Sequence, residues 1–153
     1  MKRLPLFLFL GVCIVLGSAW PVLGKDSPED AKAMVEKAIA YYKAEGKEKA
    51  FSEISDPEGR FKKGDLYVFV YDLNGTAVAR PVQKGLIGAN IITAVDGAGR
   101  PYVKERIELA KTKGKGWQDY RYFNPTTKKM EDKTAWIETY DGYVFGCGAY
   151  KGQ

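Results

Sequence analysis

The sequence predicts an α+β fold in which N-terminal helices pack on a curved antiparallel sheet of about five strands. One observation is a stripe of apolar residues at helical spacing in residues 28–45. The other is a series of three runs, at 117–123, 134–140 and 143–150, in which large apolar or aromatic residues alternate with polar ones. Consecutive strands joined by short turns pair as an antiparallel meander, which buries one face and leaves the other to be covered.

Residues 1–24 have the three parts of an export signal. Lys2 and Arg3 precede an apolar stretch over residues 4–16, and residues 22–24 form a small-residue end. We therefore expect cleavage after Gly24, which leaves residues 25–153 as a single domain in the periplasm or outside the cell. An uncleaved leader is the alternative, and it would be the expected contact with a membrane.

Helices are expected at the start of this domain and again near its middle. Ser27 is a good N-cap and Pro28 suits the first helical position, so the first helix begins there and continues to Glu45. Gly46 ends it, because glycine readily adopts the left-handed conformation that closes a helix. The inner face of this helix consists of Ala31, Met34, Val35, Ala38, Ile39 and Tyr42. Two further helices are expected over residues 47–55 and 102–113.

Turn signals mark the remaining strands. Residues 66–71 and 76–80 form a first hairpin around the Asn74-Gly75 pair, and Asp141-Gly142 joins the last two strands. Such pairs tolerate the positive φ angles of a tight hairpin turn. Residues 81–101 are rich in glycine and lack steady alternation, so they are expected to form a long connection, where ligands are often bound.

Composition excludes several functional classes. The chain has no histidine, which removes the Ser-His and Cys-His nucleophile pairs, the imidazole general base and every zinc site that contains histidine. The formal net charge is only +5, with basic and acidic residues interspersed, so no nucleic-acid partner is expected. We expect no catalytic residue, no metal and no cofactor.

Cys147 is expected to be a buried core residue. It lies in the last predicted strand between Gly146 and Gly148, and these glycines indicate that another part of the backbone approaches closely. Removal of the leader takes away Cys13, so no internal disulfide is expected. The alternative for Cys147 is a reactive thiol.

The order of these elements resembles the Cache domains, which are PAS-like extracytoplasmic sensor modules, and in particular the single Cache domains of type 2. Several short patterns carry the resemblance in the same order as in that family. The first hairpin matches at Leu66–Asp72 with Gly75, and the central loop matches at Leu86-Ile87-Gly88 with Asp96, Gly97 and Gly99. The third strand matches at Gly114–Trp117 with Tyr120, Tyr122 and Asn124-Pro125, and the last hairpin matches at Lys133–Glu138 and Asp141–Tyr150.

The resemblance implies a sensor domain that binds a small extracellular molecule, often a short-chain carboxylate, in a pocket between the sheet and the loops. Such domains usually belong to chemoreceptors or sensor kinases. Because these 153 residues include no signalling module, a free-standing exported binding domain is expected, with a membrane sensor or a transporter protein as a candidate partner. Many members have a His-Pro pair where this chain has Arg80-Pro81, so the family's ligand identity does not transfer directly.

The candidate ligand-binding residues combine aromatic hydroxyl groups with positive charge. Two-residue periodicity puts Tyr120 and Tyr122 on one face of their strand, with Trp117 on the other. Arg80 and Lys133 match family positions near the pocket, where a ligand carboxylate would be their partner. The full candidate set is Arg80, Tyr102, Trp117, Tyr120, Tyr122 and Lys133. Two alternatives stay open: an interaction module whose pocket is degenerate, and an exported enzyme that uses carboxylates or Cys147.

Overall fold

The computed structural model describes residues 26–152, so the expected leader and its cleavage site lie outside the described residues. Three α-helices pack against one antiparallel sheet of six strands, which confirms the predicted α+β fold. The helices are α1 (Pro28–Glu45), α2 (Lys47–Ile54) and α3 (Tyr102–Lys113), with a short 3-10 helix η1 (Lys84–Leu86). The strands are β1 (Lys62–Lys63), β2 (Leu66–Asp72), β3 (Ala77–Ala79), β4 (Lys115–Asn124), β5 (Lys129–Tyr140) and β6 (Tyr143–Tyr150).

The C-terminal strand β6 lies in the middle of the sheet. The order is β1-β2-β6-β5-β4, and β3 pairs with β2 outside this path. The predicted meander β4-β5-β6 is confirmed, and β6 also pairs with β2, with Val70 opposite Phe145. Through this pairing the first hairpin and the meander become one continuous sheet.

The turn between β5 and β6 has the geometry that its two residues predict. Asp141 and Gly142 have φ angles of 49° and 74°, so both are left-handed, as a two-residue hairpin turn of this twist requires. Tyr140 and Tyr143 then pair directly across the turn. The local sequence therefore determines the register of this hairpin.

Several strand boundaries differ from the prediction, most clearly those of β5 and β3. β5 begins at Lys129 rather than Thr134, because its charged first residues pair with the end of β4 and extend the hairpin. β3 is limited to residues 77–79. The chain leaves β3 at Arg80, whose guanidinium donates hydrogen bonds to the loop that follows rather than extending along the strand.

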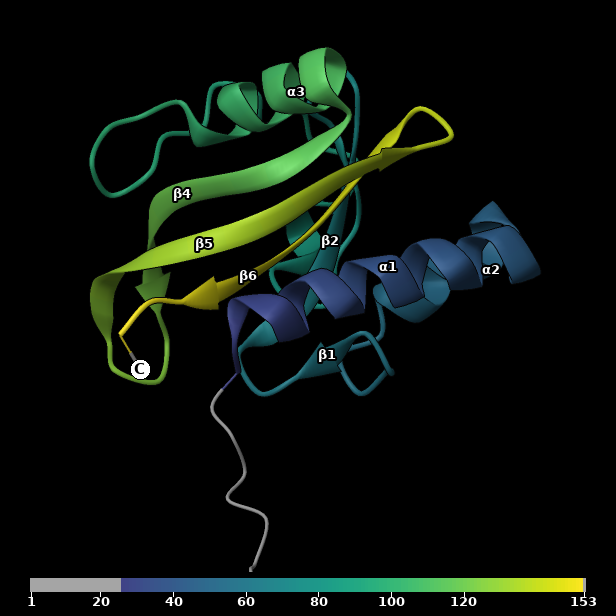
Figure 1. Ribbon diagram of the computed structural model, residues 1–153, viewed down its shortest axis with the longest axis horizontal. Coiled ribbons are helices and arrows are strands. Elements are labelled where there is room, and N and C mark those ends of the chain that lie inside the picture. Colours follow the sequence, from purple (N-terminus) through teal and green to yellow (C-terminus); the bar gives the residue numbers. More distant parts are fainter. Residues whose placement is uncertain (1–25, 153) are drawn as a thin grey trace, which may run out of the picture.

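The helices cover both faces of the sheet, with α1 and α2 on one side and α3 on the other (Figure 1). Ser27 and Asp30 form a reciprocal capping box at the start of α1. Met34 is half-buried, and the rest of the predicted inner face is buried against the sheet: Ala31, Val35, Ala38, Ile39 and Tyr42. This side of the sheet is an ordinary hydrophobic core.

Cys147 belongs to this core, as predicted. Its side chain is fully buried with Sγ 3.9 Å from the Met34 Sδ, and burial raises the pKa of the thiol to about 12. The flanking glycines face the opposite side of the sheet, where side chains approach them most closely; the expected backbone approach is present at Gly148, where the Thr134 carbonyl oxygen would lie 3.3 Å from an added Cβ. A Cβ at Gly146 would lie 2.3 Å from the Phe69 ring, and one at Gly148 would lie 2.9 Å from both Lys133 Cε and Tyr120 Oη.

Candidate ligand-binding site

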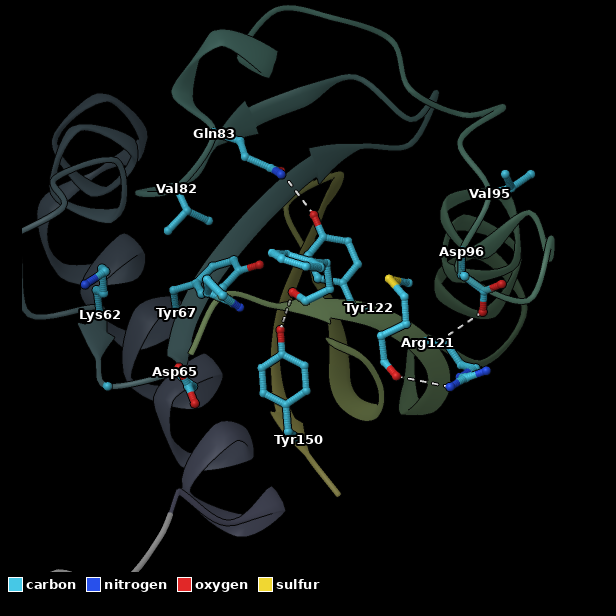
Figure 2. A pocket seen from close by; sticks show the side chains of 15 residues that line it. Lys62, Asp65, Tyr67, Val82, Gln83, Val95, Asp96, Arg121, Tyr122 and Tyr150 are labelled. Atoms are coloured by element: carbon cyan, nitrogen blue, oxygen red, sulfur yellow. Dashed lines mark hydrogen bonds between the residues drawn. The ribbon is translucent and has the colours of Figure 1, made fainter. Parts of the chain in front are cut away.

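A cavity of about 600 Å³ opens on the α3 side of the sheet. It lies between the end of the sheet near the β4–β5 turn and the loop of residues 81–101. Figure 2 shows the rings of Tyr67, Tyr122 and Tyr150 in the middle, with Val82 and Gln83 on one side and Val95 on the other. Its volume is within the range of small-molecule sites in proteins.

Strand register brings these aromatic residues together. Lys133 of β5 lies opposite Tyr120 on one neighbouring strand and opposite Tyr150 on the other. Tyr122 follows two residues after Tyr120 and therefore shares its face. Tyr67 comes from β2, on the far side of β6. The centre of the sheet thus presents four tyrosines and one lysine on a single face.

Lys133 is the centre of this group. The residue is 1% exposed, and its Nζ lies 4.2 Å from the ring centroid of Tyr150, 4.9 Å from that of Tyr67 and 5.9 Å from that of Tyr122. All three rings line the cavity, whereas Lys133 itself lies against them and is not one of the residues that line it. Burial lowers the pKa of this ammonium to about 8. Within residues 26–152, the Lys133 ammonium forms no hydrogen bond and no ion pair. The three ring faces stabilise its charge, and the negative charge of Asp65 adds to this by raising the pKa of the ammonium.

Gly148 makes room for this arrangement. Its missing side chain leaves space for Lys133 Cε and Tyr120 Oη, which both lie within 2.9 Å of an added Cβ. Because both atoms lie close to the Cβ position of residue 148, the Tyr120 hydroxyl is near the end of the Lys133 side chain. Tyr102 from α3 stacks in parallel on Tyr120, with ring centroids 5.5 Å apart and planes 4° apart. Burial raises the pKa of both phenols, so they are hydrogen-bond donors at neutral pH.

Arg106 of α3 is a second interior cation. Its guanidinium carbon lies 4.3 Å from the ring centroid of Phe69 and 5.2 Å from those of Tyr102 and Tyr120. The Nε donates to Gln118 Oε1 at 2.9 Å, while the buried Nη2 has no partner among the described residues. The sequence analysis missed Arg106. The signal was present, because helical spacing places residue 106 on the same face as residues 103, 107 and 110.

Arg80 is buried where β3 leads into the loop. Its Nε donates to the Val82 carbonyl at 2.7 Å and its Nη2 to Gln83 Oε1 at 2.8 Å. Gln83 Oε1 also accepts a hydrogen bond from the Tyr122 hydroxyl at 3.1 Å. Arg80 therefore bonds to neutral acceptors and holds the cavity wall, and its charge has no carboxylate partner among the described residues.

Among the described residues, no buried carboxylate forms an ion pair with these three cations. Among the described residues, Asp96 is the one buried acid, and it caps its own loop. It accepts hydrogen bonds from the backbone N–H groups of Ala98, Arg100 and Arg121 and from the Arg100 guanidinium. Although burial alone would raise it, these bonds lower the pKa of Asp96 to about 2. Asp65 lies on the cavity wall, half-buried, and accepts a hydrogen bond from Thr126 at 3.3 Å.

The structure brings five of the six candidate residues to the α3 side of the sheet: Arg80, Tyr102, Tyr120, Tyr122 and Lys133. Trp117 lies on the opposite face, half-exposed, where its ring is 5.1 Å from that of Trp136. The alternation that separates it from Tyr120 follows from the strand period. Besides Arg106, the sequence analysis missed Tyr67, Gln83 and Tyr150, which the pairing of β2 with β6 and the path of the loop bring to the cavity.

The family of this chain follows from a family model. Residues 24–152 match the model of the single Cache domain 2. The chain belongs to this family. Cache domains are extracytoplasmic sensor modules that bind small molecules and are typically not catalytic, so this chain is a Cache sensor domain. Within residues 26–152, no helix has both the length and the apolar composition needed to cross a membrane.

Individual relatives agree with this assignment. The chain is 33% identical over 88 residues to the sensor histidine kinase MctS of Rhizobium johnstonii. This match covers 56% of the chain but only 19% of the kinase. A methyl-accepting chemotaxis protein from Vibrio parahaemolyticus shares the fold, with a TM-score of 0.69 and 21% identity over 81% of this chain and 88% of that one.

A solved Cache chemosensory domain concerned with carboxylic acid recognition also has this fold. Its TM-score is 0.62 and its identity 24%, over 80% of this chain and 87% of the other. At this identity the likeness shows the fold alone.

Proposed function

We propose that the cavity binds a small organic carboxylate and that residues 25–153 act as an exported ligand-binding domain rather than as an enzyme. The observation that carries the proposal is the set of three interior cations, Arg80, Lys133 and Arg106, without a free buried carboxylate among the described residues. A buried charge is costly unless it is paired. An anionic ligand at Lys133 supplies the missing partner.

The residues around Lys133 suit a carboxylate. Its ammonium offers three donors, and the Tyr120 hydroxyl lies on the same face of the sheet. Tyr122, whose hydroxyl donates to Gln83, contributes its ring. A charge-assisted hydrogen bond of this kind contributes about 1.5–3 kcal/mol. The surrounding rings exclude water, which strengthens the contact. The likeness to a Cache domain concerned with carboxylic acid recognition supports the same ligand class.

Export and partner belong to the same proposal. The tripartite pattern of residues 1–24 supports a cleaved leader and a periplasmic or secreted domain. The similarity to part of a sensor histidine kinase supports a membrane sensor as a protein partner, with a transporter as the alternative. The ligand then acts by stabilising one conformation of the domain that the partner recognises.

A thermal-shift screen with matched compounds tests the ligand class. Small carboxylic acids are compared with their primary amides, which have nearly the same shape but no charge. We expect one or more acids to raise the melting temperature, because a ligand that binds only the folded state stabilises it by mass action, whereas the amides have little effect. Stabilisation by amides and acids alike would contradict a site built around a cation, and no response to any acid would reject the ligand class.

Carboxylate affinity is expected to fall as the pH rises above about 8. The pKa of Lys133 is lowered to about 8 by burial, so its ammonium is present below that pH and is lost above it. Well above this pKa, the charged fraction and hence the apparent affinity fall about tenfold per pH unit. Calorimetry between pH 6.5 and 9.5 measures this profile. Lys151→Met, which removes an exposed lysine, is expected to leave this pH profile unchanged. A flat profile in the parent protein would exclude Lys133 as the carboxylate partner.

A further inference from the structure

The mouth of the cavity is apolar. Val95, Phe123 and Met130 are 60%, 50% and 41% exposed, and all three line this cavity. They are three of the five large hydrophobic residues that are exposed among residues 26–152. Single exposed apolar residues are common on protein surfaces, but a group of them around one cavity marks a binding surface.

These residues come from separate parts of the chain. Val95 belongs to the long loop, Phe123 to the end of β4 and Met130 to the start of β5. Gly97 allows Met130 to lie against the loop, because a Cβ at residue 97 would be 2.2 Å from Met130 Cε. The Gly97 N–H also donates to the Arg121 carbonyl at 3.2 Å, which joins the loop to β4. The apolar rim is therefore a product of the tertiary fold.

One side chain connects this rim to the cation. The Tyr150 ring centroid is 4.2 Å from Lys133 Nζ, and its hydroxyl donates to the Phe123 carbonyl at 2.8 Å. The buried ammonium of Lys133 and the apolar rim are thus connected through Tyr150, which lines the cavity. Two cations line this cavity, Arg121 and Lys62. The Arg121 guanidinium, on the side of Val95, is already paired, because it contacts Asp132 at 3.3 Å and the Met130 carbonyl at 3.1 Å. Lys62 lies on the opposite side of the cavity, near Val82 (Figure 2).

The size of the cavity also exceeds that of a short acid. A two-carbon carboxylate has four heavy atoms, whereas a volume of about 600 Å³ corresponds to roughly twenty water molecules at about 30 Å³ each. A ligand confined to the lysine would leave the apolar rim in contact with water. A ligand with an apolar body would bury that rim and gain the hydrophobic free energy of doing so.

We propose that the ligand of this cavity is an amphipathic carboxylate, with its carboxylate at Lys133 and an alkyl or aryl body against Val95, Phe123 and Met130. The inference rests on the proposed carboxylate site and adds the chemistry of the rest of the ligand. It makes Val95, Phe123 and Met130 specificity-determining residues. A second charge placed against these three apolar side chains would lose hydration, and Lys62 lies on the other side of the cavity (Figure 2).

Calorimetry with straight-chain acids from acetate to octanoate tests the inference on the full chain. We expect affinity to increase about fourfold for each added methylene that is buried, until the chain passes the rim. Dicarboxylates of the same length are expected to bind more weakly. Equal affinity along the series, or tighter binding of the dicarboxylates, would overturn the amphipathic ligand while leaving the carboxylate site standing. If no acid of any length binds, both proposals fail.

Rim variants separate the apolar body from the carboxylate contact. Phe123→Ser and Met130→Gln are expected to weaken octanoate binding at least about tenfold, since each loses several buried methylene contacts, and to leave acetate binding unchanged. Ile87→Ser is the matched control, because Ile87 is similarly exposed but does not line the cavity. Equal losses for acetate and octanoate, or equal losses in the control, would contradict the assigned role of the rim.

Discussion

Replacing Lys133 with methionine is expected to weaken carboxylate binding strongly and to stabilise the ligand-free protein. The ammonium is buried among three tyrosine rings, and burial lowers its pKa from 10.5 to about 8. This difference corresponds to roughly 3 kcal/mol of unfavourable free energy at neutral pH. Methionine has a similar shape and no charge, so it removes that cost. Calorimetry should show affinity lower by at least about tenfold, because the lost charge-assisted contact is worth 1.5 kcal/mol or more.

The matched control is Lys151→Met. Lys151 is exposed and pairs with Asp119 at 2.6 Å, an interaction that contributes only about 0–1 kcal/mol at a surface. This variant is expected to change neither the melting temperature nor the affinity measurably. A Lys133→Met protein that still binds the carboxylate at parental affinity would reject the assigned contact. A clearly lower melting temperature would mean that the ammonium stabilises the fold.

Gly146→Ala is expected to destabilise the protein strongly. The added Cβ would lie 2.3 and 2.4 Å from two atoms of the Phe69 ring and 2.9 Å from Ile137 Cδ1, and both side chains are buried in the core. Overpacking of a filled core costs about 1–3 kcal/mol, and these short distances favour the upper end. Chemical denaturation should show a lower midpoint with an unchanged slope.

Two further variants locate the cause in the Phe69 contact. Gly85→Ala is the control, because an added Cβ there has no neighbour within 4 Å, so its stability is expected to be unchanged or slightly higher. Combining Gly146→Ala with Phe69→Leu should restore part of the loss, since the two sites share the contact that is overfilled. Purely additive effects in this double-mutant cycle would show that the clash with the ring is not the cause.

Local features of the fold could be predicted from the sequence because they depend on neighbouring residues. The cap at Ser27, the turn at Asp141-Gly142 and the burial of Cys147 are all confirmed. Each follows from a short-range rule: a side chain that reaches a free N–H, a φ angle that few residues adopt, or an apolar residue in a predicted core strand. The strand period likewise separated Tyr120 and Tyr122 from Trp117.

The composition of the site depends on contacts between distant segments. The sequence does not show that β6 lies between β2 and β5, because pairing of strands far apart in the chain depends on how whole faces are buried rather than on local pattern. That pairing brings Tyr67 and Tyr150 to Lys133. Arg106 illustrates the same limit, since an arginine within a helix is normally assigned to the surface. Only the tertiary structure provides the aromatic rings over which a buried guanidinium is stable.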